Sequence, residues 1–161
     1  MRKLVAGLAL ILLMSTGCNK KSECPENNDV APAVEEQMVK DYLTANGITA
    51  TKYKSNMYYQ ILTPGTGAFP NQCSTVEVGY NLKLTNGNTI PQSPGNQVFN
   101  LQGLIPAWIQ GIPLVQEGGS IRLFAPPSLA YGSQPQRDAN GNITIPGNSV
   151  LIFDINVVDI K

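Results

Sequence analysis

The stretch that decides the fold is "GLIPAWIQGIPLVQEGGSIRLFAPPSLAYG", residues 103–132. It holds the only tryptophan of the chain, Trp108, among apolar residues, prolines and glycines, and its only charged residues are Glu117 and Arg122. The segment "PAWIQGI" begins with a proline suited to a first helical turn and predicts one short helix. The whole chain lacks histidine. The stretch is therefore either ordinary core or the wall of a pocket that works without a titrating group.

Strand patterns surround this short helix. Apolar residues alternate with others in "STVEVGYNLKLTNG", residues 74–87, and "VLIFDINVVDI", residues 150–160, and "NMYYQIL" and "GGSIRLFAP" add further strands. Asn86-Gly87 predicts a tight turn. Antiparallel strands wrapped on one short helix predict an α+β fold.

A second helix is predicted earlier, over "AVEEQMVKDYLTANG", residues 33–47. Helical spacing relates Val34 to Met38 and Tyr42, and Val39 to Leu43, and Asn46-Gly47 supplies a stop signal. We expect one short amphipathic helix here.

The chain begins "MRKLVAGLALILLMSTGC". Basic residues, an apolar run from Leu4 to Met14 and small residues follow one another, as in a secretory signal peptide over residues 1–17. The run is too short to cross a bilayer as a permanent helix.

The stretch Ser15-Thr16-Gly17-Cys18 resembles a bacterial lipobox, although Ser15 stands where leucine is usual. The resemblance implies acylation of Cys18, a lipid anchor in the membrane and a polar tether over residues 18–32. The alternative is plain secretion by cleavage near Gly17. Asparagine after Cys18 favours the outer membrane, facing the periplasm, over the inner one.

Two cysteines remain, Cys24 and Cys73. In an oxidising compartment they either form a disulfide that ties the tether to the domain or stay as two buried thiols. Both interpretations remain open.

Charge and composition narrow the function. Eleven basic and eleven acidic residues balance, so nothing indicates nucleic-acid binding. We expect no metal and no cofactor, because histidine, a cysteine cluster with ligand spacing and a phosphate-binding loop are all missing from the sequence. Residues 84–116 carry no charge, which indicates a surface that is covered or used.

From about Met57 to Lys161, the sequence resembles the FKBP-type peptidyl-prolyl cis-trans isomerases. Six landmarks occur in order, namely "YYQILTPGTG", "VEVGYNLKLTNG", "FNLQGLIPAW", "GIPLVQEGG", "FAPPSLAYG" and "IPGNSVLIFDINVVDI". The resemblance implies a curved antiparallel sheet over a short helix, with the substrate proline in the apolar groove between them. We therefore expect a helical extension over residues 33–50 and an FKBP-like domain over 51–161.

The resemblance also implies roles for individual residues. Trp108 would form the pocket floor, and Tyr131 would donate its hydroxyl to the peptide carbonyl near the proline. Tyr80, Phe99 and Phe153 would form aromatic walls. The remaining substrate-binding positions are Ile90, Gln97, Leu104, Ile105 (through its backbone amide) and Ile145. The implied partners are proline-containing segments of exported proteins and macrolide inhibitors.

One departure concerns the family pattern Phe, Asp, Ser, Ser, which here reads Ile90, Pro91, Gln92, Ser93. Proline has neither a side-chain acceptor nor a backbone donor, so the polar contact that the aspartate makes is expected to be missing. Two functions compete on this basis. The first is an envelope isomerase with reduced activity, and the second is a catalytically weak proline-binding chaperone or interaction module.

Overall fold

The computed structural model describes residues 24–161. The predicted signal peptide and Cys18 lie outside these residues. In chain order, the elements are α1 (Ala33–Ala45), β1 (Thr51–Lys52), β2 (Tyr58–Thr63), β3 (Thr75–Leu84), β4 (Thr89–Ile90), β5 (Gln97–Asn100), η1 (Leu101–Gly103), α2 (Pro106–Gly111), η2 (Ile112–Leu114), β6 (Ser120–Ala125), η3 (Pro127–Leu129), β7 (Gln136–Arg137), β8 (Ile143–Ile145) and β9 (Leu151–Ile160).

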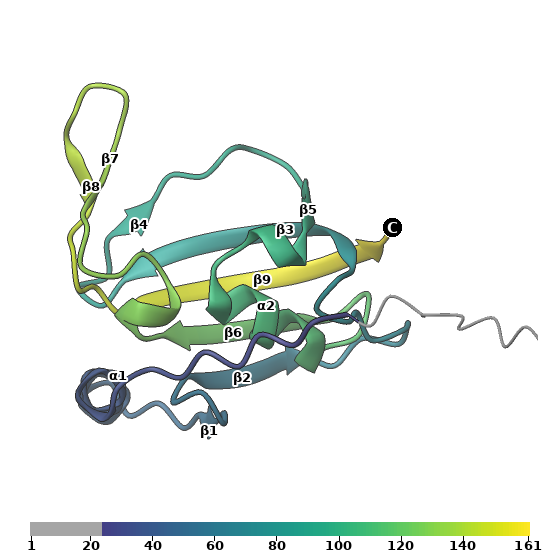
Figure 1. Ribbon diagram of the computed structural model, residues 1–161, viewed down its shortest axis with the longest axis horizontal. Coiled ribbons are helices and arrows are strands. Elements are labelled where there is room, and N and C mark those ends of the chain that lie inside the picture. The colour runs from purple at the N-terminus through teal and green to yellow at the C-terminus, as the bar shows by residue number, and fades with distance from the viewer. Residues whose placement is uncertain (1–23) are drawn as a thin grey trace, which may run out of the picture.

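Seven strands form one antiparallel sheet in the order β1-β2-β6-β9-β3-β4, and β5 also pairs with β3 (Figure 1). The two longest strands, β3 and β9, lie side by side at its centre, with Leu82 opposite Phe153. The helix α2 lies across one face of the sheet (Figure 1). The predicted α+β architecture, a curved antiparallel sheet on one short helix, is confirmed.

Alternation along the central strands divides the core between the two faces of the sheet. Leu151, Phe153 and Ile155 of β9 are buried in the main cluster with Trp108 of α2. Ile152, on the opposite face, joins a second cluster that covers the other side of the sheet, made of Val39, Leu43, Tyr58, Phe124, Val150 and Ile152. The predicted extension over residues 33–50 therefore packs directly on the sheet.

The side of α1 that is buried is not the one formed by Val34, Met38 and Tyr42. Val39 and Leu43 are buried, whereas Val34 is 70% exposed and Met38 is 38% exposed. Glu36 is buried instead, because the Tyr58 hydroxyl donates to it at 3.0 Å and the ammonium groups of Lys40 and Lys52 lie 2.7 and 2.9 Å away. A carboxylate thus occupies a place that periodicity alone assigns to an apolar residue.

Glu36 predicts how stability depends on pH. Hydrogen bonding from Lys40, then from Lys52, lowers the pKa of Glu36 from 4.5 to about 2. The ionised form is favoured in the folded state, so its stabilisation is complete above about pH 4.5 and is lost as the pH falls towards 2. Glu36→Gln should be less stable than the wild type at pH 7, and the difference should vanish near pH 2, as measured by urea unfolding.

A suitable control for this comparison is Glu26→Gln. Glu26 is exposed and makes no ion pair within residues 24–161. Its substitution should leave the unfolding midpoint nearly unchanged across the same pH range. A stability difference for Glu36→Gln that persisted undiminished at pH 2 would contradict the assignment.

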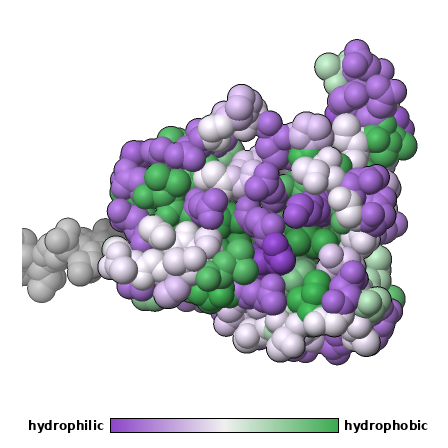
Figure 2. Space-filling view, turned by 180° about the vertical axis from the view of Figure 1, so that it is seen from behind, coloured by the Kyte–Doolittle hydropathy of each residue, from purple (hydrophilic) through white to green (hydrophobic). Residues whose placement is uncertain are grey.

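Seen from behind, the face of the sheet away from α2 shows hydrophilic residues interleaved with separate hydrophobic areas (Figure 2). The hairpin of β7 and β8 projects from the body as an arm (Figure 1). Within residues 24–161, no helix has the length and apolar character needed to span a bilayer.

Candidate functional site

A cavity of about 150 Å³ opens between α2 and the sheet. Its rim is half-exposed at Leu104, Ile105 and Tyr131, so it is accessible from solvent. Its lining is formed by Tyr80, Phe99, Leu104, Ile105, Trp108, Tyr131 and Phe153. Seven of the ten residues predicted to act on substrate thus meet around one opening, although they come from five separate parts of the chain.

Trp108 lies at the centre of this cavity and is only 4% exposed. Three aromatic rings surround it at centroid distances of 4.8 Å for Tyr80, 5.8 Å for Phe99 and 5.6 Å for Phe153, and their planes are tilted from the indole by 84–89°. Edge-to-face arrangements of this kind are favourable for aromatic rings. The indole is therefore fixed by aromatic packing at the buried end of the cavity.

The short helix α2 holds the indole in place. Pro106 occupies its first turn, and the helix ends at Gly111, with Pro113 in the following 3₁₀ turn. A Cβ atom on Gly111 would lie 2.6 Å from Leu123 Cδ1 on β6, so a larger residue there would force this buried leucine to shift. The prolines and glycines of the 103–132 stretch thus fix where Trp108 lies.

The hydroxyl of Tyr80 is oriented by a residue that sequence reasoning did not select. It donates to Gln92 Oε1 at 2.7 Å, and Gln92 Nε2 donates to the Ile90 carbonyl at 2.9 Å. The amide thus links β3 to the segment after β4. Its position two residues after the short strand is not a recognisable signal in the sequence.

The two tyrosine hydroxyls of the lining remain protonated. Burial raises the pKa of Tyr80 and of Tyr131 above its ordinary value of 10, and for Tyr131 the nearby Tyr80 adds to the effect. Both are therefore neutral donors at physiological pH. Within residues 24–161, the Tyr131 hydroxyl donates to no protein acceptor, so it is free to bind a ligand.

Three predicted substrate-binding residues do not line the cavity. Ile90 is partly buried against the main core and pairs with Leu82, and Ile145 is buried within that core at 5% exposure. Gln97 begins β5 opposite Val78. Ile90 and Ile145 therefore pack with the core, and Gln97 lies in the sheet beside β3.

The described part of the chain contains no group of three or more histidine, cysteine or acidic residues arranged to hold a metal ion. The cavity lining has no charged residue. Its chemistry is therefore limited to apolar contact, neutral hydrogen-bond donors and exclusion of water.

The family model described as FKBP-type peptidyl-prolyl cis-trans isomerase matches residues 67–158, which include every residue of the cavity lining. The chain belongs to this family. The FKBP assignment made from the six sequence landmarks is confirmed.

The chain is also similar to several individual FKBP-type proteins. The FKBP-type peptidyl-prolyl cis-trans isomerase FkpA of Buchnera aphidicola is 38% identical over 110 residues, covering 66% of this chain and 41% of the relative. FkpA of Aeromonas hydrophila is 35% identical over 137 residues, covering 80% and 48%. The crystal structure of FkpA from Escherichia coli superimposes with a TM-score of 0.67 at 32% identity, covering 80% of this chain and 60% of that one. The chain thus spans less than half the length of these two curated relatives.

In this FKBP, the expectation that Pro91 leaves the cavity without a polar contact is wrong. The polar contact at the cavity is present, because Gln92 Oε1 accepts from Tyr80 one position later than the family's aspartate. Pro91 itself is exposed. A neutral amide therefore takes the place of a carboxylate in orienting the aromatic wall.

Gln92→Leu should leave the Tyr80 hydroxyl without an acceptor in a half-buried site. We expect the free energy of unfolding to fall by about 1 kcal/mol and the affinity for proline peptides to weaken. Urea unfolding and titration of Trp108 fluorescence measure the two effects.

A double-mutant cycle supplies the control. Adding Tyr80→Phe removes the unpaired hydroxyl, so the double variant should regain much of the stability that Gln92→Leu loses. Strictly additive losses would show that the two side chains do not act on one another.

Proposed function

We propose that this FKBP catalyses cis-trans isomerisation of X–Pro bonds in exported proteins at the bacterial cell envelope. The observation that carries the proposal is the open, uncharged cavity with the Trp108 indole as its floor and three aromatic rings around it. A prolyl ring is compact and apolar, and this lining would cover it while leaving the preceding peptide bond near the rim.

The proposed catalysis needs no nucleophile and no general base. An X–Pro bond rotates over a barrier of roughly 18–20 kcal/mol, because planar resonance separates charge across the amide. The twisted transition state loses that resonance and is less dipolar. An apolar cavity disfavours the planar ground state more, and lowering the barrier by about 4 kcal/mol accelerates rotation about a thousandfold.

Two donors at the rim are placed to orient the peptide. Tyr131 is 38% exposed and lines the cavity, and its side chain ends in a hydroxyl donor. The Ile105 backbone amide, at the residue before α2, donates to no acceptor within the described residues. We assign Tyr131 and Ile105 to the carbonyl groups that flank the proline.

A protease-coupled assay with a proline tetrapeptide tests the proposal. The oxidised protein should accelerate isomerisation well above the uncatalysed rate, and a macrolide inhibitor should suppress the acceleration and change Trp108 fluorescence. Rates equal to buffer, with proline-peptide binding retained, would reject catalysis and identify a proline-binding chaperone or interaction module. Neither turnover nor binding would reject both functions.

Tyr131→Phe should lower kcat/KM by about threefold to tenfold, since one neutral hydrogen bond is lost. The free energy of unfolding should change by less than about 0.5 kcal/mol, because the hydroxyl has no protein partner to lose. The same assay and urea unfolding measure both. Tyr42→Phe removes a hydroxyl on α1, away from the cavity, and serves as the matched control. Equal losses of turnover and stability would make Tyr131 a structural residue.

We further propose that acylated Cys18 anchors the protein to the outer membrane, facing the periplasm. The chain from Cys18 to Cys24 spans at most about 20 Å when fully extended, so the disulfide would keep the domain close to the membrane surface. Fatty-acid labelling of the full chain should be lost in Cys18→Ser and retained in Cys24→Ser. Absence of labelling in the wild type would support plain secretion by cleavage near Gly17, and labelling that survives Cys18→Ser would place the acyl group elsewhere.

A further inference from the structure

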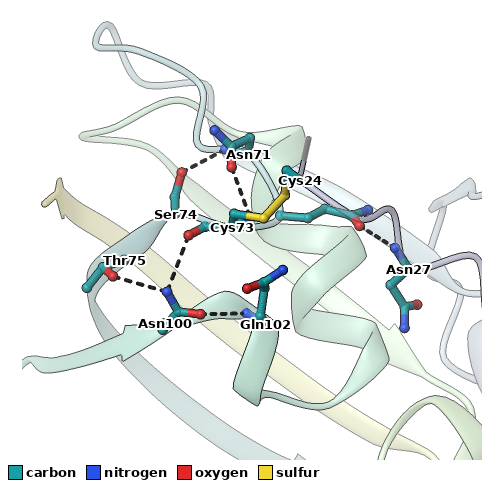
Figure 3. The surroundings of a disulfide bond; sticks show 9 residues. Cys24, Asn27, Asn71, Cys73, Ser74, Thr75, Asn100 and Gln102 are labelled. Carbon is teal, nitrogen blue, oxygen red and sulfur yellow. Dashed lines mark hydrogen bonds between the residues drawn. A yellow bond between two sulfur atoms is a disulfide. The ribbon is translucent and has the colours of Figure 1, made fainter. Parts of the chain in front are cut away.

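Residues 24–32, here named the strap, run from the disulfide to the start of α1 across the side of α2 that faces away from the sheet (Figures 1 and 3). At the beginning, Cys24 is bonded to Cys73. At the end, Ala31 is 2% exposed, its amide donates to the Ser55 carbonyl at 3.0 Å, and its own carbonyl accepts from Asn56 Nδ2 at 2.8 Å. The strap is thus attached to the domain at both ends, unlike a free tether.

Gln110 connects the strap to α2 at its middle. This side chain is 1% exposed and lies two residues after Trp108. Its Nε2 donates to Asn27 Oδ1 at 2.6 Å and to the Asp29 carbonyl at 2.9 Å. Asn27 is held in turn by its backbone amide, which donates to Gln72 Oε1 at 2.5 Å. A helix of six residues is not stable by itself, so its position depends on such contacts.

The other end of the disulfide reaches the same cavity by a second route. The Cys73 carbonyl accepts from Asn100 Nδ2 at 3.3 Å, and Asn100 Oδ1 accepts from the Gln102 amide at 3.1 Å (Figure 3). That second bond caps η1, which leads directly into Leu104 and Ile105 of the rim. The disulfide therefore joins the supports of both the floor and the rim.

We infer that Gln110 is a positioning residue for the isomerase site, and that the Cys24–Cys73 disulfide is a redox-sensitive latch on the strap that supports it. The inference rests on the proposed function. When the disulfide is reduced, the first residues of the strap can detach from the domain. The side-chain amide of Gln110 then loses its acceptors, and the position of α2, and with it Trp108, is less fixed.

The chemistry of opening is a two-electron reduction by an external dithiol. One thiolate of the dithiol attacks a sulfur of the disulfide, the Cys24–Cys73 bond breaks, and a mixed disulfide forms. The second thiolate of the reductant displaces the protein sulfur, so the dithiol becomes a disulfide and both cysteines end as thiols after taking up two protons. Both cysteines are half-buried, and Cys24 lines a surface hollow of about 220 Å³, which gives a reductant access to its sulfur.

The test compares the oxidised full chain with the chain reduced by dithiothreitol and alkylated, at a temperature where circular dichroism shows both folded. As the only tryptophan, Trp108 reports on its own surroundings. We expect a shift of its emission and a rise in KM for a proline peptide of about threefold to tenfold. Cys24→Ser combined with Cys73→Ser should reproduce both changes and no longer respond to dithiothreitol.

Gln110→Met isolates the positioning residue with the disulfide intact and should change emission and KM in the same direction. The matched control is Gln116→Met, because Gln116 Nε2 donates to the Gly67 carbonyl at 2.8 Å, away from the strap. It should leave Trp108 emission and the response to reduction unchanged.

Identical emission and KM in the oxidised and reduced chains, together with wild-type values for Gln110→Met, would overturn the latch while leaving the isomerase function standing. Absence of both turnover and peptide binding in the oxidised wild type would overturn the proposed function instead. An emission shift without a change in KM would also overturn the inference, since Trp108 would then move without consequence for the site.

Discussion

Trp108→Ala is expected to abolish proline-peptide binding and to reduce isomerisation to the uncatalysed rate. The substitution removes the floor of the cavity and the ring that Tyr80, Phe99 and Phe153 contact at 4.8–5.8 Å. The free energy of unfolding should fall by about 3–5 kcal/mol, because a buried aromatic side chain is replaced by a void. Calorimetry measures the binding, the coupled assay the turnover, and circular dichroism in urea the stability.

Two variants separate the role of the indole from its packing. Phe69→Ala removes an aromatic ring that is 61% exposed and should change peptide binding, turnover and stability only slightly. Trp108→Phe keeps a ring in the site and should lose less stability than Trp108→Ala. Peptide binding at wild-type affinity by a destabilised Trp108→Ala would show that the indole serves the core alone.

The second large effect is expected from Cys24→Ser combined with Cys73→Ser. The bridged residues are 49 positions apart, and releasing a loop of that length from the unfolded chain lowers stability by about 4 kcal/mol in the chain-entropy account. Urea unfolding of the double variant and of the oxidised wild type measures the difference.

The wild type in reducing buffer is the control for this comparison, and its unfolding midpoint should coincide with that of the double variant. Cys18→Ser should retain the full stability of the oxidised protein, because it leaves the bridge intact. A loss of less than about 1 kcal/mol on removing both cysteines would contradict the chain-entropy account for this loop.

The architecture follows from local patterns, whereas the family and the role of Trp108 follow from the resemblance carried by the six landmarks. The alternation of apolar and other residues along β3 and β9 predicts which side chains face α2, and Pro106 predicts the start of the helix. Both patterns depend on residues only a few positions apart. The six landmarks place Trp108, Tyr80, Phe99 and Phe153 in the same domain. The structure brings their rings together as the resemblance implied.

Other features of the site arise from contacts between distant segments. Gln92 meets Tyr80 because β4 folds back on β3, and a neutral amide thereby takes over a contact that the sequence, judged at Pro91, lacks. Ile145 points into the core and not into the cavity, since the direction of a three-residue strand depends on its partner β7. Periodicity carries no information about either arrangement.

In the N-terminal region, too, some features follow from the local sequence and others from tertiary contacts. The sequence alone determined that a helix forms near residues 33–47, that two cysteines remain after Cys18, and that the domain has an apolar, histidine-free site. Only the tertiary structure decided that Glu36 is buried between two lysines, that Cys24 and Cys73 are joined, and that Gln110 rests on the strap. Local spacing sets the periodicity of helices and strands, whereas partners for buried polar groups are chosen by the packing of segments far apart in the chain.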